Sequence, residues 1–388
     1  MYAVGMFFSG YIGDRVNLRL FLTLGMLMSG ILVAFQGLAY YWKIHSFGYF
    51  AVFYGIQGLF QSIGWPSVVA VMGNWVAKGT RGLPLGVWNA HTSVGNILGS
   101  LISVAGLSVG LHGQDWPAAF FLCGGCIFFV GCLVFFFLHP HPNDVGLSGP
   151  NDDEHAAPSD SPILSHMSPM NIGGSGGHGD SELKESLLLN ADRAIAQPKS
   201  KGGILTALRI PGVIPFALAL LFAKLVAYTF IYWLPLYLTH LNYTSAEAGQ
   251  LSTFFDLGGI LGGIIAGYLS DKLKMPGVVS VGFLLAAIPS LYMYRSVTKS
   301  IGDKSTSENI ALMLFAGAIV NGPYALITTA ISADLGTHKS LKGQATLMAT
   351  VTSIIDGTGS IGAALQGVLI GWLSARYSWN GVFYLLNV

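Results

Sequence analysis

One stretch carries more information about the fold than any other: Leu220-Leu221-Phe222-Ala223-Lys224-Leu225-Val226-Ala227-Tyr228-Thr229-Phe230-Ile231-Tyr232-Trp233-Leu234-Pro235. It lies within an apolar run from Ile210 to Leu241, in which Lys224 is the only charged residue. About 20 apolar residues in a helix span a bilayer, so the run predicts a transmembrane helix with Lys224 near its middle. A lysine at that depth costs about 2.5–3.5 kcal/mol on insertion scales and must therefore face a cavity or a partner.

Two interpretations of Lys224 follow from this position. The ammonium either holds an anionic solute in a polar central cavity or is paired with a neighbouring carboxylate for structural reasons. Tyr228 lies one helical turn later on the same face and would place a phenol hydroxyl beside the ammonium. We favour the first interpretation, with Lys224 and Tyr228 as substrate-binding residues.

The whole chain has the composition of a membrane protein. Of its 388 residues, 52% are hydrophobic and only 10% are charged, whereas soluble domains carry about 25% charged residues. This predicts an all-α polytopic membrane protein, and the 51 glycines suit closely packed membrane helices. Nine apolar runs are long enough to span: Leu18–Tyr41, Phe47–Val76, Leu83–Leu111, Trp116–Leu138, Ile210–Leu241, Ala246–Leu269, Val278–Tyr294, Ile310–Leu335 and Leu341–Trp372.

The two ends of the chain look like parts of further helices. Met1–Ile12 is apolar but too short to span, and Trp379–Val388 is cut short as well. We therefore expect a fold truncated at both ends, which lacks its first helix and the end of its last one.

A segment of different composition divides the chain. Residues 139–209 are rich in proline, serine, glycine, histidine and acids and cannot bury a core, which predicts a disordered linker. It would separate an N-terminal helical bundle, residues 1–138, from a C-terminal helical bundle, residues 210–388.

The two halves also repeat one another. Gly10-Tyr-Ile-Gly-Asp14-Arg15 returns as Gly267-Tyr-Leu-Ser-Asp271-Lys272, 257 positions later, and Pro66 returns as Pro323 at the same separation. Two matches at one offset on either side of a linker indicate a duplication, and hence two pseudo-symmetric bundles.

Lysine and arginine predict the orientation. Alternate short connections hold eight of them, the opposite connections hold four, and the linker lies on the side of the eight. That side is therefore predicted to be cytoplasmic. The formal net charge of +1 gives no reason to expect a nucleic-acid partner. The eight residues are Arg15, Arg19, Lys78, Arg81, Lys272, Lys274, Lys339 and Lys342.

The repeated Gly-x-x-x-Asp-Arg/Lys pattern predicts a gate. An acid at a cytoplasmic helix end can accept hydrogen bonds from the N-terminus of a neighbouring helix or pair with the basic residues that follow. Contacts of this kind can form in one state and break in another. The alternative is ordinary positive-inside loop charge. The gating residues predicted in this way are Asp14, Arg15, Arg19, Asp271 and Lys272.

With its doubled motif, two halves and central linker, the chain resembles the major facilitator superfamily. Gln61-Ser-Ile-Gly64-Trp65-Pro66, Gly86-Val-Trp88-Asn89 and Trp233-x-Pro235-x-Tyr237 resemble the organophosphate:phosphate antiporters. These include the bacterial glycerol-3-phosphate transporter and the eukaryotic sugar-phosphate exchangers. The run from Asn321 to Gly343 is similar to the eukaryotic branch in particular.

The resemblance implies an alternating-access antiporter that exchanges a sugar phosphate, such as glucose-6-phosphate or glycerol-3-phosphate, for inorganic phosphate. It implies a lipid bilayer as surroundings and, through the eukaryotic branch, the endoplasmic reticulum membrane. Exchange would follow if unpaired cations hold back reorientation of the empty cavity. A non-transporting sensor or another organic-anion transporter on the same fold is the alternative. No cofactor, metal site or nucleophile–base pair is expected, so the chain is not predicted to be an enzyme.

The resemblance also implies site residues. Trp65, Trp88 and Asn89 match residues that line the central cavity of the family, and Asp256 falls where the family has an acid. The family's second phosphate-binding arginine falls at Ala227, one turn after Lys224. Its first belongs to the helix before Met1.

Other buried polar residues are open to two interpretations. The family's cavity histidine falls at Thr92, one position after His91, which either contacts ligand or is hydrogen-bonded between helices. Gln61 shares a helical face with Gln57 and Trp65, which suits a cavity wall or interhelical packing. Asp256 and Asp356 are intramembrane acids, and either could be the counter-ion of Lys224.

Overall fold

A computed structural model describes residues 1–109, 116–150, 203–300, 306–341 and 347–386. These residues form helices and connections without a strand, which confirms the all-α prediction. The principal helices of the first half are α1 (Tyr2–Gly13), α2 (Leu18–Tyr41), α3 (Phe47–Gln61), α4 (Gly64–Trp75), α5 (Gly82–Asn89), α6 (His91–Val109) and α7 (Trp116–Phe137). Those of the second half are α10 (Val213–His240), α11 (Ser245–Leu273), α12 (Pro276–Ser300), α13 (Thr306–Leu326), α14 (Ser332–Gly336) and α15 (Met348–Leu386).

Shorter elements complete the described chain. The 3₁₀ helices η1 (Pro142–Val145) and η3 (Lys339–Leu341), the short helix α9 (Ile204–Leu208) and the π-helical turn η2 (Ile327–Ile331) lie in or near the connections. Most of the predicted linker, residues 151–202, lies outside the described residues. The bundle boundaries at 138 and 210 stay a prediction.

Seven helices of the described chain are long and apolar enough to cross a membrane, against nine expected spans. The two remaining runs are each divided into two shorter helices. Phe47–Val76 forms α3 and α4, and the described part of Leu83–Leu111 lies in α5 and α6, which meet at Ala90. Counting long apolar helices in the described chain therefore gives fewer spans than counting apolar runs.

Pro66 explains the division between α3 and α4. Proline has no backbone N–H, and its ring clashes with the carbonyl four residues earlier, which here belongs to Ser62. That carbonyl accepts instead from the hydroxyl of Ser9 on α1, at 2.8 Å. A neighbouring helix thus supplies the hydrogen bond that this carbonyl needs when it is buried in a membrane.

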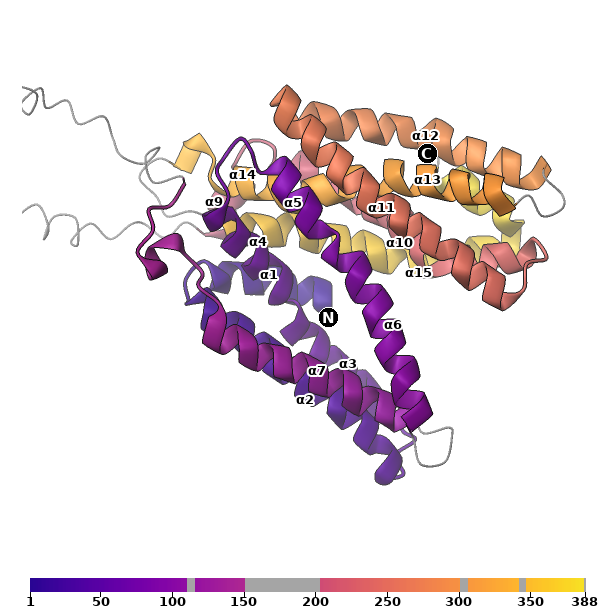
Figure 1. Ribbon diagram of the computed structural model, residues 1–388, viewed down its shortest axis with the longest axis horizontal. Helices are drawn as coiled ribbons and strands as arrows, with labels where there is room; N and C mark the ends of the chain where they lie inside the picture. The colour runs from indigo at the N-terminus through magenta and orange to yellow at the C-terminus, as the bar shows by residue number, and fades with distance from the viewer. Residues whose placement is uncertain (110–115, 151–202, 301–305, 342–346, 387–388) are drawn as a thin grey trace, which may run out of the picture.

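The helices form two groups that meet at one end (Figure 1). In the first, α2 packs along α7 and α6 contacts α7; in the second, α11 packs along α13 and α10 along α15. The groups touch through α1 with α15 and through α5 with α11. They lie close at the end from which the linker leaves, here called the linker end, and diverge toward the other end.

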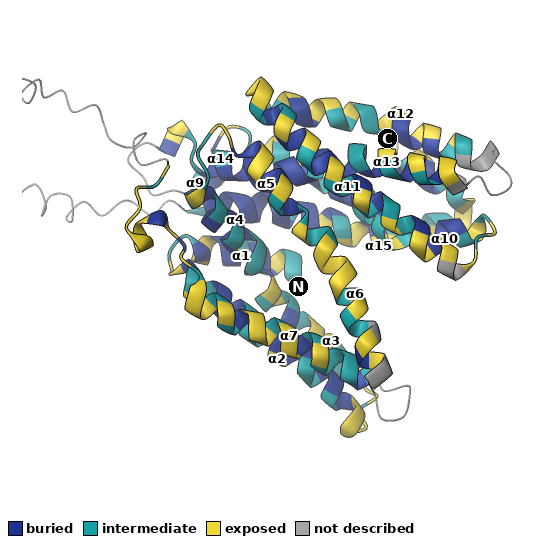
Figure 2. Cartoon of the chain, in the orientation of Figure 1, coloured by how far each residue is buried: buried dark blue, intermediate teal, exposed yellow. Residues whose placement is uncertain are grey.

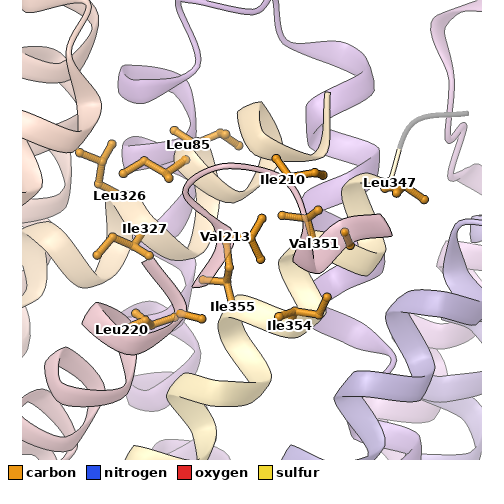
Figure 3. Packing of buried hydrophobic residues seen from close by; sticks show 14 of the residues in the cluster. Leu85, Ile210, Val213, Leu220, Leu326, Ile327, Leu347, Val351, Ile354 and Ile355 are labelled. Atoms are coloured by element: carbon orange, nitrogen blue, oxygen red, sulfur yellow. The ribbon is translucent and has the colours of Figure 1, made fainter. Parts of the chain in front are cut away.

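A buried apolar cluster joins the halves at the linker end. Leu85 on α5 belongs to the same buried cluster as Leu326, Ile327 and Val351 of the second half (Figure 3). The outward faces of the long helices are exposed, as Figure 2 shows for α7 and α12, and many of their exposed side chains are large and hydrophobic. In a bilayer these faces contact lipid, so the cross-half cluster supplies the interior packing.

Candidate functional site

A polar cavity of about 310 Å³ lies between the two halves. Helices α1, α4, α5 and α6 line it from the first half, and α10, α11, α13 and α15 line it from the second. Its volume is at the lower end of the roughly 300–1,000 Å³ typical of small-molecule sites. The lining residues are Tyr2, Trp65, Gly86, Asn89, Ala90, Thr92, Ser93, Asn96, Lys224, Tyr228, Ile231, Asp256, Gly259, Ile260, Asn321, Tyr324 and Asp356.

Lys224 lies in the wall of this cavity with a carboxylate beside it. Its Nζ is 2.7 Å from Oδ1 of Asp356 and donates to Oγ of Ser360 at 3.3 Å. Asp356 and Ser360 are one turn apart on α15, which packs along α10. The side chains of the pair are 4% and 2% exposed, so both charges are removed from bulk water.

The pair answers one question that the sequence left open. Asp356, and not Asp256, is the counter-ion of Lys224, while Asp256 lines the same cavity from α11. The sequence analysis expected unpaired cations to hold back reorientation of the empty cavity. Lys224 is not such a cation, because it is paired with Asp356. Breaking such a pair by removing one partner costs about 3–5 kcal/mol, because the other charge stays buried.

Two tyrosine rings flank the ammonium. Nζ of Lys224 lies 5.9 Å from the ring centroid of Tyr228 and 5.6 Å from that of Tyr324 on α13. Distances within about 6 Å allow cation–π attraction. Tyr228 therefore offers its ring to the ammonium, and Tyr324 is a site residue that the sequence analysis missed.

Three aromatic rings of the first half cluster at the cavity. The centroids of Trp65 and Trp88 are 5.6 Å apart, and His91 lies 4.3 Å from Trp88 and 6.1 Å from Trp65. Trp65 lines the cavity, and its indole N–H donates to the carbonyl of Thr328 in η2, at 3.3 Å. Trp65 thus bridges the two halves.

Trp88 and His91 lie beside the cavity rather than among its lining residues. His91 Nδ1, at the start of α6, is 2.7 Å from the carbonyl of Trp88, near the end of α5, so this contact joins two consecutive helices of the first half. Thr92, where the family has a histidine, does line the cavity. The structure thus places Thr92, and not the imidazole of His91, among the lining residues.

The structure places Gln61 away from the cavity. It borders a separate crevice of about 160 Å³ between α2, α3 and α7, and Gln57 is hydrogen-bonded to Gln36 of α2. The prediction that Gln57, Gln61 and Trp65 share a helical face assumed one continuous helix. The break before Pro66 ends that register, so only Trp65 reaches the cavity.

At the linker end, each acid of the repeated motif caps a helix of the other half. Asp271, near the end of α11, accepts from the N–H groups of Gly82 and Leu83 at the start of α5, both at 2.7 Å. Asp14, after α1, accepts from the N–H groups of Ala349 and Thr350 at the start of α15, at 2.9 and 2.8 Å. The first N–H groups of a helix have no intrahelical partner, so a carboxylate satisfies them well.

The glycine of each motif makes this approach possible. A Cβ on Gly267 would lie 2.2 Å from the carbonyl oxygen of Gly82, and one on Gly10 would lie 2.3 Å from that of Ala349. Contacts under 3.0 Å are not tolerated, so the backbones meet only because these residues lack a side chain. In each Gly-x-x-x-Asp motif, the glycine therefore lets two helices approach closely, and the aspartate one turn later caps the N-terminus of the neighbouring helix.

The surroundings of Asp14 have opposing effects on its pKa. Burial raises the pKa of Asp14 above its usual range, while the hydrogen bonds from Thr350 and Ala349 and the charge of Arg15 act to lower it. The net direction is upward, so its carboxylate is easier to protonate than that of an exposed aspartate.

The basic residues of the motifs contact their own segments. The Arg15 guanidinium donates to the carbonyl of Tyr11 at 2.7 Å, and the Lys272 ammonium lies 5.8 Å from the ring of Tyr268. Arg19 lies in the first turn of α2, where its backbone N–H donates to Asn17. Of the predicted gating residues, the two acids make the contacts between halves described above.

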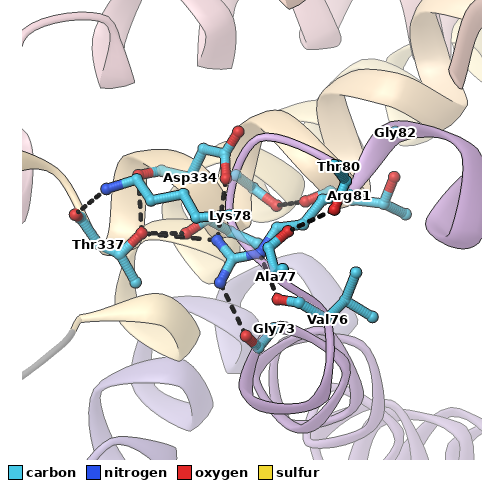
Figure 4. A network of polar contacts seen from close by, with 12 residues as sticks. Gly73, Val76, Ala77, Lys78, Thr80, Arg81, Gly82, Asp334 and Thr337 are labelled. Atoms are coloured by element: carbon cyan, nitrogen blue, oxygen red, sulfur yellow. Dashed lines mark hydrogen bonds and ion pairs between the residues drawn. The ribbon is translucent and has the colours of Figure 1, made fainter. Parts of the chain in front are cut away.

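An ion pair that the sequence analysis missed also joins the halves (Figure 4). Arg81 Nη1 is 2.9 Å from Oδ1 of Asp334 on α14, and Nη2 donates to the carbonyl of Gly73 at 2.7 Å. Arg81 is 2% exposed. Beside it, Lys78 Nζ donates to the carbonyl of Thr337 at 2.8 Å. The sequence analysis counted both basic residues only as positive loop charge.

Comparison with known proteins agrees with this geometry. The sequence model of the protein family described as Major Facilitator Superfamily matches residues 1–354 of this chain. "Putative glycerol-3-phosphate transporter 1" of Arabidopsis thaliana is 49% identical over 391 residues, which cover 100% of this chain and 70% of that protein. Glucose-6-phosphate exchanger SLC37A2 of Bos taurus is 49% identical over 386 residues, covering 99% and 75%. Glucose-6-phosphate exchanger SLC37A1 of Homo sapiens is 47% identical, covering 99% and 73%.

Solved structures share the fold. The transporter FucP in its outward conformation matches with a TM-score of 0.64 at 12% identity, over 100% of this chain and 85% of that one. The proton:xylose symporter XylE matches with a TM-score of 0.63 at 12% identity, over 100% of this chain and 81% of that one.

In the described part of the chain, no group of three or more histidine, cysteine or acidic residues could hold a metal ion.

Proposed function

Because the chain belongs to the major facilitator superfamily and is an integral, multi-pass membrane protein, we propose that it exchanges a sugar phosphate for inorganic phosphate by alternating access. Relatives almost half identical over nearly the whole chain are named as glucose-6-phosphate exchangers and a glycerol-3-phosphate transporter. The two solutes share a phosphate group and a hydroxylated carbon part. An endoplasmic reticulum location stays a prediction from the resemblance.

The observation that carries the proposal is the buried ammonium of Lys224 in the wall of a cavity between the halves. A dianionic phosphate forms strong charge-assisted hydrogen bonds with such a group in a water-poor site. The bound anion competes with Asp356 for the ammonium, since the carboxylate lies 2.7 Å away. Asp356 therefore keeps Lys224 compensated when no anion is bound and gives way when phosphate arrives.

Alternating access then requires the linker-end contacts to break. The caps formed by Asp14 and Asp271 and the pair of Arg81 with Asp334 all join the halves at that end. They stabilise the state in which this end is closed. Opening there exposes the same cavity to the predicted cytoplasmic side, as alternating access around a fixed site demands.

Phosphate exchange in proteoliposomes tests the proposal. Vesicles loaded with inorganic phosphate should take up labelled glucose-6-phosphate or glycerol-3-phosphate and release phosphate, and the sugar phosphate should be recovered chemically unchanged. A protein that binds sugar phosphate in detergent without exchange would be a sensor. Hydrolysis of the solute would indicate an enzyme. Either result would overturn the proposal.

Variants of the ion pair separate a binding role from a structural one. Lys224→Ala should abolish phosphate binding, and Ser103→Ala on α6 serves as the control because Ser103 contacts Cys123 on α7. If Lys224 only neutralises Asp356, the double variant Lys224→Ala with Asp356→Asn should regain exchange. A double variant that folds but remains inactive supports the binding role.

A further inference from the structure

Lys224 carries its charge at the end of a long, flexible side chain, and neighbouring residues of α15 surround that side chain. Asp356, Gly359 and Ser360 lie within about one turn of α15, which packs along α10. A lysine side chain gives up much rotamer freedom when it is held in one geometry. The ammonium can therefore meet a solute in one defined place only if contacts on α15 fix its direction.

The contact with Asp356 does not fix this direction. Nζ of Lys224 is 2.7 Å from Oδ1 of Asp356, yet among the described residues this buried oxygen has no hydrogen-bond partner. The two groups therefore attract one another as charges, without the alignment that a hydrogen bond requires. Because that attraction depends on charge and distance, the phosphate of a solute can take the place of the carboxylate.

Ser360 forms the directional contact. Nζ of Lys224 donates to Oγ of Ser360 at 3.3 Å, and this hydroxyl itself donates to the backbone carbonyl of Asp356 at 2.9 Å. A hydroxyl has one hydrogen and two acceptor lone pairs, so the bond to the carbonyl fixes its rotation and leaves the lone pairs for the ammonium. Ser360 is buried and is not a lining residue of the cavity. It can act on a solute only through Lys224.

Gly359 leaves room for the aliphatic part of Lys224. A Cβ at this position would lie 3.0 Å from Cδ of Lys224 and 2.8 Å from Cγ of Leu220, one turn earlier on α10. Contacts this short would force these side chains to move. The missing side chain of Gly359 therefore lets the lysine lie against α15, where its ammonium reaches Ser360.

We infer that Ser360 is the residue that positions Lys224 for phosphate, and that Gly359 provides the space that this position needs. An ammonium has three N–H donors. One stays with Ser360 throughout, Asp356 compensates the charge while no anion is bound, and phosphate replaces Asp356 beside the ammonium. This inference rests on the proposed function and adds to it the group that holds the ammonium in place while its counter-ion changes.

Substitution of Ser360 tests the positioning role in phosphate-loaded vesicles that are given labelled inorganic phosphate. Ser360→Ala removes the acceptor, so the half-saturating phosphate concentration should rise about tenfold, the equivalent of one hydrogen bond to a charged group. The maximal rate should change less than about twofold, because the contact serves binding and is kept during reorientation. Ser360→Thr keeps the hydroxyl, so its half-saturating concentration should stay within about threefold of that of the unmodified protein.

Thr358→Val on the same helix is the matched control. The hydroxyl of Thr358 donates to the carbonyl of Ile354 at 2.7 Å, the same type of bond that Ser360 makes to Asp356. In the described chain, Thr358 is not among the lining residues of the cavity, so both kinetic values should stay unchanged. Gly359→Ala displaces the lysine instead and should raise the half-saturating concentration, which tests the position of Lys224 even if Ser360→Ala folds poorly.

Three results would overturn the positioning role while the proposed function stands. These are an unchanged half-saturating concentration in Ser360→Ala, a loss of maximal rate alone, and a Ser360→Thr variant as impaired as Ser360→Ala. Failure of the unmodified protein to exchange phosphate would instead overturn the proposed function itself. Equilibrium binding of labelled phosphate in detergent should show the same loss of affinity with alanine and the same recovery with threonine.

Discussion

Replacing Asp271 with asparagine should open the linker end. The carboxylate accepts one hydrogen bond at each oxygen, from Gly82 and Leu83, both at 2.7 Å. Asparagine can accept only one of them, and its NH₂ group then faces the other N–H. The lost charge also removes a favourable interaction with the N-terminus of α5.

The size of the effect follows from these contacts. A hydrogen bond to a charged group contributes about 1.5–3 kcal/mol, and a charge at a helix terminus adds about 0.3–1 kcal/mol. The variant should therefore destabilise the closed linker end by about 2–4 kcal/mol relative to the open one. That energy corresponds to a change of about 30- to 800-fold in the ratio of the two states.

Distance measurement between spin labels can read the two states. Thr80→Cys before α5 and Met275→Cys after α11 place both labels at exposed positions of the linker end, once the native cysteines are replaced. Asp271→Asn should shift the distribution toward longer distances, and exchange should slow, while phosphate binding in detergent stays near that of the unmodified protein.

A matched neighbour supplies the control. Lys272→Gln should leave the distances unchanged, because its ammonium lies over the ring of Tyr268 on its own helix. If Asp271→Asn leaves the distribution unchanged, the cap does not hold the linker end closed. If phosphate binding collapses together with exchange, the motif maintains the fold and its gating role is refuted.

Four further substitutions test the remaining charges. Lys224→Arg keeps the charge but changes its reach and donor geometry, so the half-saturating phosphate concentration should rise about tenfold in exchange assays; an unchanged value would contradict direct contact. Asp356→Asn leaves a buried ammonium without its carboxylate, so the melting temperature should fall and saturating phosphate should restore it by more than in the unmodified protein. A melting temperature indifferent to phosphate would count against competition at Lys224. Arg81→Ala should strand Asp334 and, like Asp14→Asn, lengthen label distances at the linker end; unchanged distances would exclude Arg81 from the gate.

Local properties of the chain were enough to predict its class. The length of an apolar run measures the thickness of a bilayer, so composition and run length alone indicated an all-α membrane protein. The position of Lys224 within its run indicated a polar cavity for the same reason. The repeated Gly-x-x-x-Asp pattern showed that the halves are related, and it identified the two acids that cap helices.

Partners far apart in the chain were decided only by the tertiary structure. From the sequence, Asp256 and Asp356 were equally plausible counter-ions of Lys224. The packing of α10 along α15 brings Asp356 to it. Arg81 and Asp334 lie 253 residues apart, so no local pattern could pair them. Gln61 was misplaced because the helix breaks between Gln61 and Trp65, which changes the face that the residues after the break present. Run length and periodicity report how a segment meets the bilayer, whereas these contacts depend on how separate helices cross.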